Sequence, residues 1–268
     1  MTHTEIMPAI YTHYAVANAL FNNLPSHIQK KVKSHLSLYF FGAQGADFCF
    51  FYHVFGEKAP NLGSHLHRTN TYEVFRLLKA FSNRSNRLFA YALGYLTHYA
   101  TDVTFHPYVY ATAGSSYTKH TRLENALDVH FKPLLHALPQ KRIFKKPSLE
   151  EEIELYILYA AIARKTNFPP LLKSSFSRAI SLFNAYPPIS SNLYRVENKA
   201  YLQYACNVEK RSWKHPSLSS VTRNDSADEL FDKALSFAQE LSASFCLALQ
   251  ENTPLPLSLF NKHFLTGV

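Results

Sequence analysis

Glycine is unusually scarce in this chain, and that scarcity restricts the folds open to it. Only 7 of the 268 residues are glycine. Folds with many strands need glycine at tight turns, and phosphate-binding loops need it where the backbone approaches the ligand. A β-rich fold and a glycine-rich phosphate loop are therefore both disfavoured, and we expect a helical chain.

Apolar residues recur at helical spacing along almost the whole chain. In residues 12–22, for example, Ala15 and Ala19 fall on the same side of a helix. No alternation of apolar and polar residues lasts long enough to predict a strand, and the polar residues 213–224 are predicted to form a loop. The predicted helices span residues 12–22, 25–41, 72–81, 86–104, 122–138, 148–165, 171–185, 194–208 and 226–249.

Helix ends are marked at two positions. Ser148 begins a Ser-Leu-Glu-Glu sequence, which is typical of a capped helix start. Pro107 is expected to end the long apolar helix before it. Residues 139–147 are interpreted as a basic surface loop. The pattern as a whole predicts an all-α chain of about eight to ten helices, in a single domain over residues 1–268.

Neither the cysteines nor the apolar segments indicate secretion or membrane insertion. The 3 cysteines are too few and too scattered for a disulfide scaffold or a cysteine-based zinc module. The N-terminus has no basic start, and His13 and Asn18 interrupt its apolar stretch, so we expect no secretory signal. The most apolar segment, residues 88–100, is too short to span a bilayer. The expectation is a cytoplasmic protein.

Basic residues exceed acidic ones, with a net charge of +9. The excess is concentrated in residues 30–33 and 141–146. Such a surface favours an anionic partner, namely phosphate esters, nucleic acid or an anionic lipid surface. The alternative is a basic face that only meets solvent.

Histidine is abundant, with 14 residues, whereas aspartate is rare. His98, Asp102 and His106 are spaced four apart, so they share one helix face. Asp102 is the one ionised side chain between residues 88 and 110. Imidazole and carboxylate together suit Zn²⁺ best among common ions. The alternative is a buried Asp–His pair that binds no metal.

Further histidines and acids lie on both sides of that segment. His120, Glu124 and Asp128 form a second stripe at intervals of four, which could equally be a solvated helix face. Upstream, Asp47 follows a turn that holds two glycines and precedes an aromatic run. The remaining candidates are His13 in the first helix and the pair His65 and His67.

Taken in order, these segments resemble the zinc-dependent phospholipase C family, which has a phospholipase C/D-type domain and is distantly akin to the P1/S1 nucleases. The likeness extends from about residue 7 to residue 245, with a metal-ligand core at 7–138 and C-terminal helices at 148–250. The motifs that carry it read THYAVAN, FGAQGADFCFFYH, LGSHLHRTN, YALGYLTHYATDVTFHPYVY and HTRLENALDVH.

The resemblance implies an all-α domain around a buried cluster of two or three zinc ions. It implies that Asp102 bridges one pair of metal positions and that Asp47 also orients or deprotonates the attacking water. His67 is favoured over His65, because Arg68 follows it as in relatives. The implied ligands of that pair are His13, Asp47, His67, His98 and Asp102, and those of a further ion are His106, His120 and Glu124.

The secreted phospholipases also use the amino group of a processed N-terminal tryptophan as a ligand. Here the amine near Met1 or Thr2, or the His3 side chain, is the candidate replacement. Translation from Met7 is a further alternative.

The implied activity is phosphodiester hydrolysis by a metal-activated water, with a phospholipid as the favoured substrate and peripheral contact with an anionic membrane. Two alternatives stay open. One is a nuclease or small phosphodiesterase that uses the same site. The other is a non-catalytic, zinc-stabilised module that binds anionic membranes.

Overall fold

The computed structural model describes residues 10–52, 61–136, 145–185 and 198–268. Within these ranges the regular structure is twelve α-helices, two 3-10 helices and one two-stranded sheet, which confirms the all-α prediction. The elements in chain order are α1 (Ile10–Asn23), α2 (Ser26–Lys33), α3 (Leu36–Gly42), η1 (Asp47–Phe51), α4 (Leu62–Leu66), α5 (Thr71–Ser82), α6 (Asn86–Ala113), α7 (Tyr117–Phe131), η2 (Lys132–Leu135), α9 (Leu149–Lys165), α10 (Lys173–Ala185), α11 (Lys199–Ala205), β1 (Trp213–Lys214), β2 (Thr222–Arg223), α12 (Ala227–Gln250) and α13 (Leu257–Phe260).

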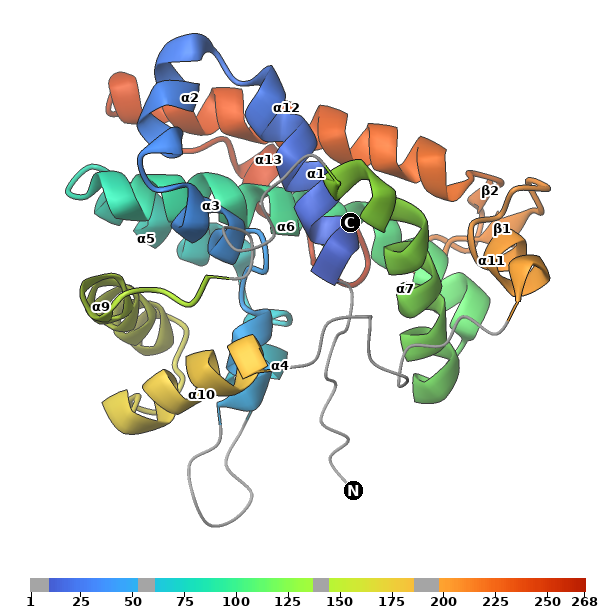
Figure 1. Ribbon diagram of the computed structural model, residues 1–268, viewed down its shortest axis with the longest axis horizontal. Coiled ribbons are helices and arrows are strands. Elements are labelled where there is room, and N and C mark those ends of the chain that lie inside the picture. Colours follow the sequence, from blue (N-terminus) through green and yellow to red (C-terminus); the bar gives the residue numbers. More distant parts are fainter. Residues whose placement is uncertain (1–9, 53–60, 137–144, 186–197) are drawn as a thin grey trace.

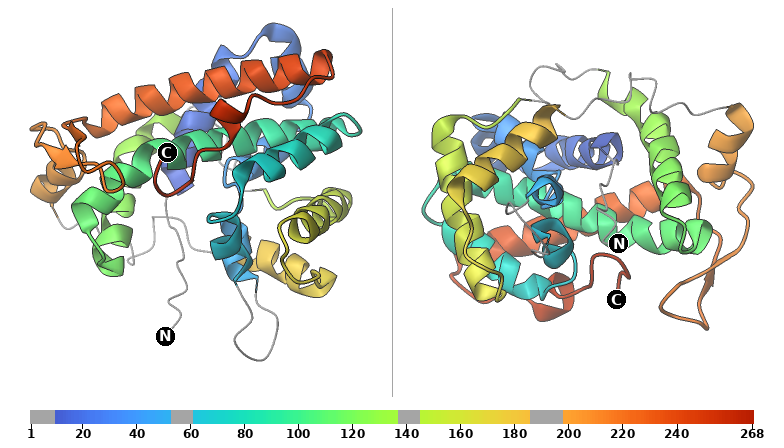
Figure 2. Two further views of the ribbon diagram at one scale, coloured as in Figure 1. Left: turned by 180° about the vertical axis from the view of Figure 1, so that it is seen from behind. Right: turned by 90° about the horizontal axis from the view of Figure 1, so that it is seen from below.

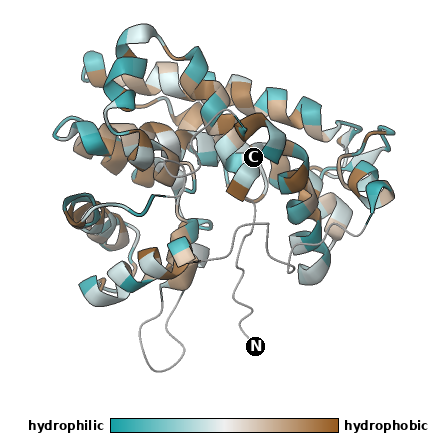
Figure 3. Ribbon diagram, in the orientation of Figure 1, coloured by the Kyte–Doolittle hydropathy of each residue, from teal (hydrophilic) through white to brown (hydrophobic). Residues whose placement is uncertain are grey.

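Helix α6 is the central element of the fold (Figure 1). It is in contact with α1, α3, α5, α7 and α12. Most of its 28 residues are buried, and Figure 3 shows hydrophobic residues along much of its length. A helix that is apolar on most sides is stable in water only when other elements surround it.

Helix α12 packs on α6, and α9 and α10 pack on elements next to it. The 24-residue α12 runs lengthwise along one side of it, as both Figure 1 and Figure 2 show. On another side α9 contacts α5, and α10 packs over η1, so these helices support the segment that carries Asp47. The capping box predicted at Ser148 is confirmed. The Ser148 hydroxyl accepts from the backbone N–H of Glu151, and the Glu151 carboxylate accepts from the backbone N–H of Ser148.

The expectation that Pro107 ends its helix is wrong, since α6 continues to Ala113. Proline has no N–H to donate to the carbonyl of Val103, four residues earlier. The C-terminal segment covers that carbonyl, and a Cβ at Gly267 would lie 2.5 Å from the Val103 oxygen. Gly267 has φ +71°, so the close approach depends on glycine. Tertiary packing therefore overrides the local break.

Three other predicted elements need correction. Residues 25–41 form two helices, because His35 leaves the helical conformation with φ −131°. The predicted loop at 213–224 contains an antiparallel hairpin, whose two-residue strands are too short for alternation to signal them. Helix α7 begins at Tyr117, five residues before its predicted start, where the hydroxyl of Ser116 caps it.

Several predictions fall outside the described residues. These are the N-terminal ligand candidates and the alternative start within residues 1–9, and most of the basic loop at 139–147. The single-domain assignment stays a prediction. Among the helices that the structure describes, none has both the length and the apolar character needed to cross a membrane.

Candidate metal centre

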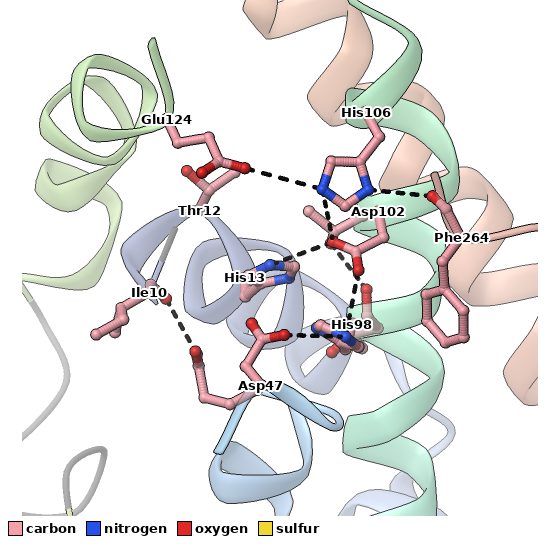
Figure 4. A network of polar contacts seen from close by, with 12 residues as sticks. Ile10, Thr12, His13, Asp47, His98, Asp102, His106, Glu124 and Phe264 are labelled. Atoms are coloured by element: carbon pink, nitrogen blue, oxygen red, sulfur yellow. Dashed lines mark hydrogen bonds and ion pairs between the residues drawn. The ribbon is translucent and has the colours of Figure 1, made fainter. Parts of the chain in front are cut away.

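Histidine and carboxylate side chains from α1, η1, α6 and α7 converge in one place (Figure 4). All eight of the predicted ligands are present there, and each is at most 8% exposed. They are His13 from α1, Asp47 from η1, His67 directly after α4, His98, Asp102 and His106 from α6, and His120 and Glu124 from α7.

The turn before Asp47 is held in place by contacts with α6 and α9. Gly45 has φ +52°, and a Cβ there would overlap the ring of His98. The hydroxyls of Tyr91 and Tyr159 both donate to the carbonyl of Gly45, each at 3.1 Å. The glycine therefore lets the backbone approach the histidine, and the two tyrosines hold it there.

Asp102 lies in the middle of four imidazoles. Its Oδ1 is 3.4 Å from Nε2 of His13 and 4.0 Å from Nε2 of His106. Its Oδ2 is 3.3 Å from Nε2 of His98 and 3.6 Å from Nε2 of His67. A carboxylate with histidines at both oxygens has the geometry to bridge two ions.

Asp47 faces two of the same imidazoles. Its Oδ1 is 3.2 Å from Nε2 of His67 and 3.8 Å from Nε2 of His98. Two groups that could hold an ion overlap at this point, with ligand atoms within 4.8 Å of one another. One consists of His13, Asp47 and His98, and the other of His67, His98 and Asp102.

A third group lies on the α7 side of Asp102. Oε1 of Glu124 is 3.0 Å from Nε2 of His120 and 3.8 Å from Nε2 of His106. These three side chains again have ligand atoms within 4.8 Å of one another. The stripe predicted from spacing thus supplies two residues to this group, and α6 supplies the third.

Many polar atoms of the cluster lack hydrogen bonds. Among the residues described, thirteen buried side-chain polar atoms have no hydrogen-bond partner, and seven of them belong to this cluster. They include Oδ2 of Asp102, Oδ1 of Asp47 and both ring nitrogens of His98. An unpaired buried polar atom is costly, so native structures rarely keep one without a reason. A role as metal ligands provides that reason.

Two backbone carbonyls orient rings of the cluster. Nδ1 of His67 bonds to the carbonyl of Gly63 at 2.8 Å, and Nδ1 of His106 bonds to that of Phe264 at 3.1 Å. A proton fixed on Nδ1 leaves Nε2 as the lone-pair donor, and in each ring Nε2 is the atom that faces the carboxylates.

Comparison with known proteins agrees with this geometry. The profile of the family described as zinc dependent phospholipase C matches residues 12–167, which is more than half of the chain and includes all eight side chains. The chain belongs to this family. No curated protein matches it, and no solved structure does.

Zinc fits the donors that this member of the family presents. The groups combine imidazole nitrogen with carboxylate oxygen and contain no thiolate, a donor set common at catalytic zinc sites. The family and the buried clusters together indicate zinc binding, while the number of ions stays a prediction.

Burial keeps most of the imidazoles neutral. Burial and the neighbouring His67 lower the pKa of His13 to about 3, and burial lowers the pKa of His98 and His106 well below its ordinary value. Neutral imidazole is the form that binds metal. For His67, burial also lowers the pKa, but the nearby carboxylates of Asp102 and Asp47 outweigh it and raise the pKa to about 10.

Two residues of the sequence patterns lie away from the cluster. Nε2 of His65 is 3.0 Å from the hydroxyl of Thr166, and its ring packs on Phe168, so of these two histidines it is His67 that lies in the cluster. Asp128 accepts hydrogen bonds from the start of α1 and takes no part in the cluster.

Sequence reasoning missed the contribution of the C-terminal segment. Besides its carbonyl bond to His106, Phe264 places its ring 5.1 Å from that of His67 and 5.7 Å from that of His98. Phe264 lies 97 residues beyond the end of the family match. A backbone carbonyl has no residue-type signature, and no motif marks the segment.

Proposed function

We propose that this chain is a zinc-dependent phosphodiester hydrolase of phospholipase C type. In this proposal the metal ligands are His13, Asp47, His67, His98, Asp102, His106, His120 and Glu124, and they hold two or three ions. The observation that carries it is the position of Asp102, whose two oxygens face four imidazole Nε2 atoms at 3.3–4.0 Å.

Bound zinc would lower the pKa of water to about 7 and stabilise the charge that develops on a phosphoryl group. The residues of the chain supply position and a proton acceptor. Asp47 is the proposed acceptor, because burial raises the pKa of its carboxyl and so favours taking up a proton. His67 lies 3.2 Å away and opposes that rise.

A phospholipid is the proposed substrate, with peripheral contact at an anionic membrane. The family supports a phospholipid, and the net charge of +9 supports attraction to an anionic surface. The cytoplasmic location remains part of the proposal.

The test combines metal analysis with a comparison of substrates. Purified protein should contain two or three zinc ions and should hydrolyse phosphatidylcholine faster than a chromogenic phosphodiester or single-stranded DNA. Asp47→Asn should lose hydrolysis, whereas the exposed control Asp228→Asn should keep it.

The other outcomes separate the alternatives. Faster cleavage of DNA than of phosphatidylcholine would favour the nuclease. A zinc-loaded protein that sediments with anionic liposomes but hydrolyses none of the three substrates would favour the non-catalytic membrane module.

A further inference from the structure

A cavity of about 810 Å³ lies at the other end of the helices that carry the metal centre. It is lined by the end of α1, by α2, by the connection from α5 to α6 and by α12. Leu20 lines it on α1, seven residues or about 10 Å along the helix from His13. Phe89 lines it on α6, nine residues or about 13 Å from His98. The cavity is thus separate from the zinc ligands.

Part of the cavity wall consists of apolar side chains of the hydrophobic core. Leu20, Leu24 and Phe89 line the cavity and are buried in the core, at most 9% exposed. Ligand-binding cavities typically enclose about 300–1,000 Å³ and are lined largely by such side chains. This wall suits a hydrocarbon chain.

The cavity has basic side chains in its lining and no carboxylate. Lys31, Arg84 and His27 line it, and none of its lining residues is acidic. The neighbouring acids Glu150 and Glu154 share one cation, because Arg87 binds Glu150 at 2.7 Å and Glu154 at 2.9 Å. Among the residues that the structure describes, Lys31 and Arg84 have no carboxylate partner.

The basic and apolar features meet at one point. Nζ of Lys31 lies 3.9 Å from the centre of the Phe89 ring, so a cation sits directly above the apolar wall. A ligand that satisfies both features has an anionic head and an apolar chain. Two permanent cations match the two charges of a phosphate monoester, and the arginine fork suits its oxygens.

We propose that this cavity binds an amphiphile with a phosphate head and a single apolar chain. Lys31 and Arg84 hold the phosphate, and the chain lies along Phe89, Leu20 and Leu24. The site does not depend on the reaction at the metal centre.

Calorimetric titration of the zinc-loaded protein with dodecyl phosphate, below its micelle concentration, tests the site. Wild type should bind one equivalent, and the double variant Lys31→Gln with Arg84→Gln should bind at least about tenfold more weakly. The matched control is Lys30→Gln, which makes the same charge change on α2 at an exposed residue that does not line the cavity. Ala243→Trp, which places an indole ring in the cavity from α12, should weaken binding at least as much.

Cys246 reports the location of the ligand. It lines the cavity and is partly exposed, whereas Cys49 and Cys206 are buried. Dodecyl phosphate should slow alkylation of Cys246 by a maleimide at least about fivefold in wild type and leave it unchanged in the double variant. Because burial raises the pKa of this thiol to about 11, the reaction is run at pH 9.

Several results would overturn the proposal. Equal binding of dodecyltrimethylammonium would exclude an anionic head, and tighter binding of dodecanoate would exclude phosphate as the preferred one. Binding that persists in Ala243→Trp without protecting Cys246 would place the amphiphile elsewhere, for instance at the metal centre.

Discussion

Two buried aspartates on successive helices, Asp102 of α6 and Asp128 of α7, have opposite surroundings. Both are at most 2% exposed. Asp128 accepts from the backbone N–H groups of Ile10 and Thr12 at 2.7 and 2.8 Å, and from the Thr12 hydroxyl at 2.7 Å. Oδ2 of Asp102 has no hydrogen-bond partner, although imidazoles surround it.

The difference separates a structural carboxylate from a ligand. Asp128 satisfies the first N–H groups of α1, which a helix cannot satisfy itself, and so fixes the helix that carries His13. Asp102 has neighbours without hydrogen-bond geometry, which is the arrangement of groups that share a cation. Burial alone therefore does not identify a ligand, and the pattern of hydrogen bonds does.

The largest expected effect is that of Asp102→Asn. It should remove more than one zinc ion per chain by elemental analysis, because both oxygens face ligand groups. Hydrolysis should fall more than about 100-fold, since loss of a group that only orients a ligand already costs ~10–100-fold.

The same variant should not lose stability when zinc is absent. In protein stripped of zinc with a chelator, Asp102→Asn should leave the free energy of unfolding unchanged or raise it, because it removes a buried carboxylate whose Oδ2 has no hydrogen-bond partner. Retention of all zinc by the variant would contradict the bridging role.

Asp128→Asn should act on stability instead. An amide nitrogen cannot accept the hydrogen bond from Ile10, so the free energy of unfolding should fall by about 1–3 kcal/mol in urea titrations. Zinc content at saturating zinc should be unchanged. If zinc were lost as in Asp102→Asn, the distinction between the two aspartates would fail.

Gly267→Ala tests whether the C-terminal segment supports the metal centre. The added Cβ would lie 2.5 Å from the Val103 carbonyl and displace the segment that holds His106. Zinc affinity of one site should fall by about tenfold in chelator competition.

Gly114→Ala is the matched control for this variant. Gly114 has φ +61° against +71° for Gly267, but a Cβ there meets nothing within 4 Å. Equal effects of the two substitutions would assign the loss to backbone strain alone.

The smallest expected effect concerns Glu229, an exposed carboxylate that forms an ion pair with Lys210. A hydrogen bond from Lys210 lowers its pKa from 4.5 to about 2. Its contribution to stability is therefore present above pH 4.5 and is lost as the pH falls from 4.5 towards 2. Lys210→Met should move this pKa towards 4.5 in an NMR titration, and an unchanged pKa would contradict the assigned cause.

How much of the site could be predicted depends on whether its residues lie on the same helix or on different ones. His98, Asp102 and His106 share one helix, so their spacing alone places them together. The stripe of His120, Glu124 and Asp128 is equally regular, but its last member faces the start of α1, and only tertiary structure decides that. The family resemblance supplied the links between helices that spacing could not.

The fold was predictable to a similar degree. Apolar periodicity found the long helices, because it reflects one buried face. The prediction at Pro107 was wrong, because proline ends a helix only where tertiary contacts do not stabilise the following turn. The carbonyl of Phe264 could not be predicted, since any residue at that position would offer the same atom.

The hydrogen bond between His106 and the carbonyl of Phe264 has a consequence for biosynthesis. It joins residues 158 positions apart. At ~5–20 residues per second, a ribosome needs roughly 8–32 s to pass from one to the other. Until Phe264 has been synthesised His106 lacks its orienting carbonyl, so the complete metal position cannot form before the segment around Phe264 has been added.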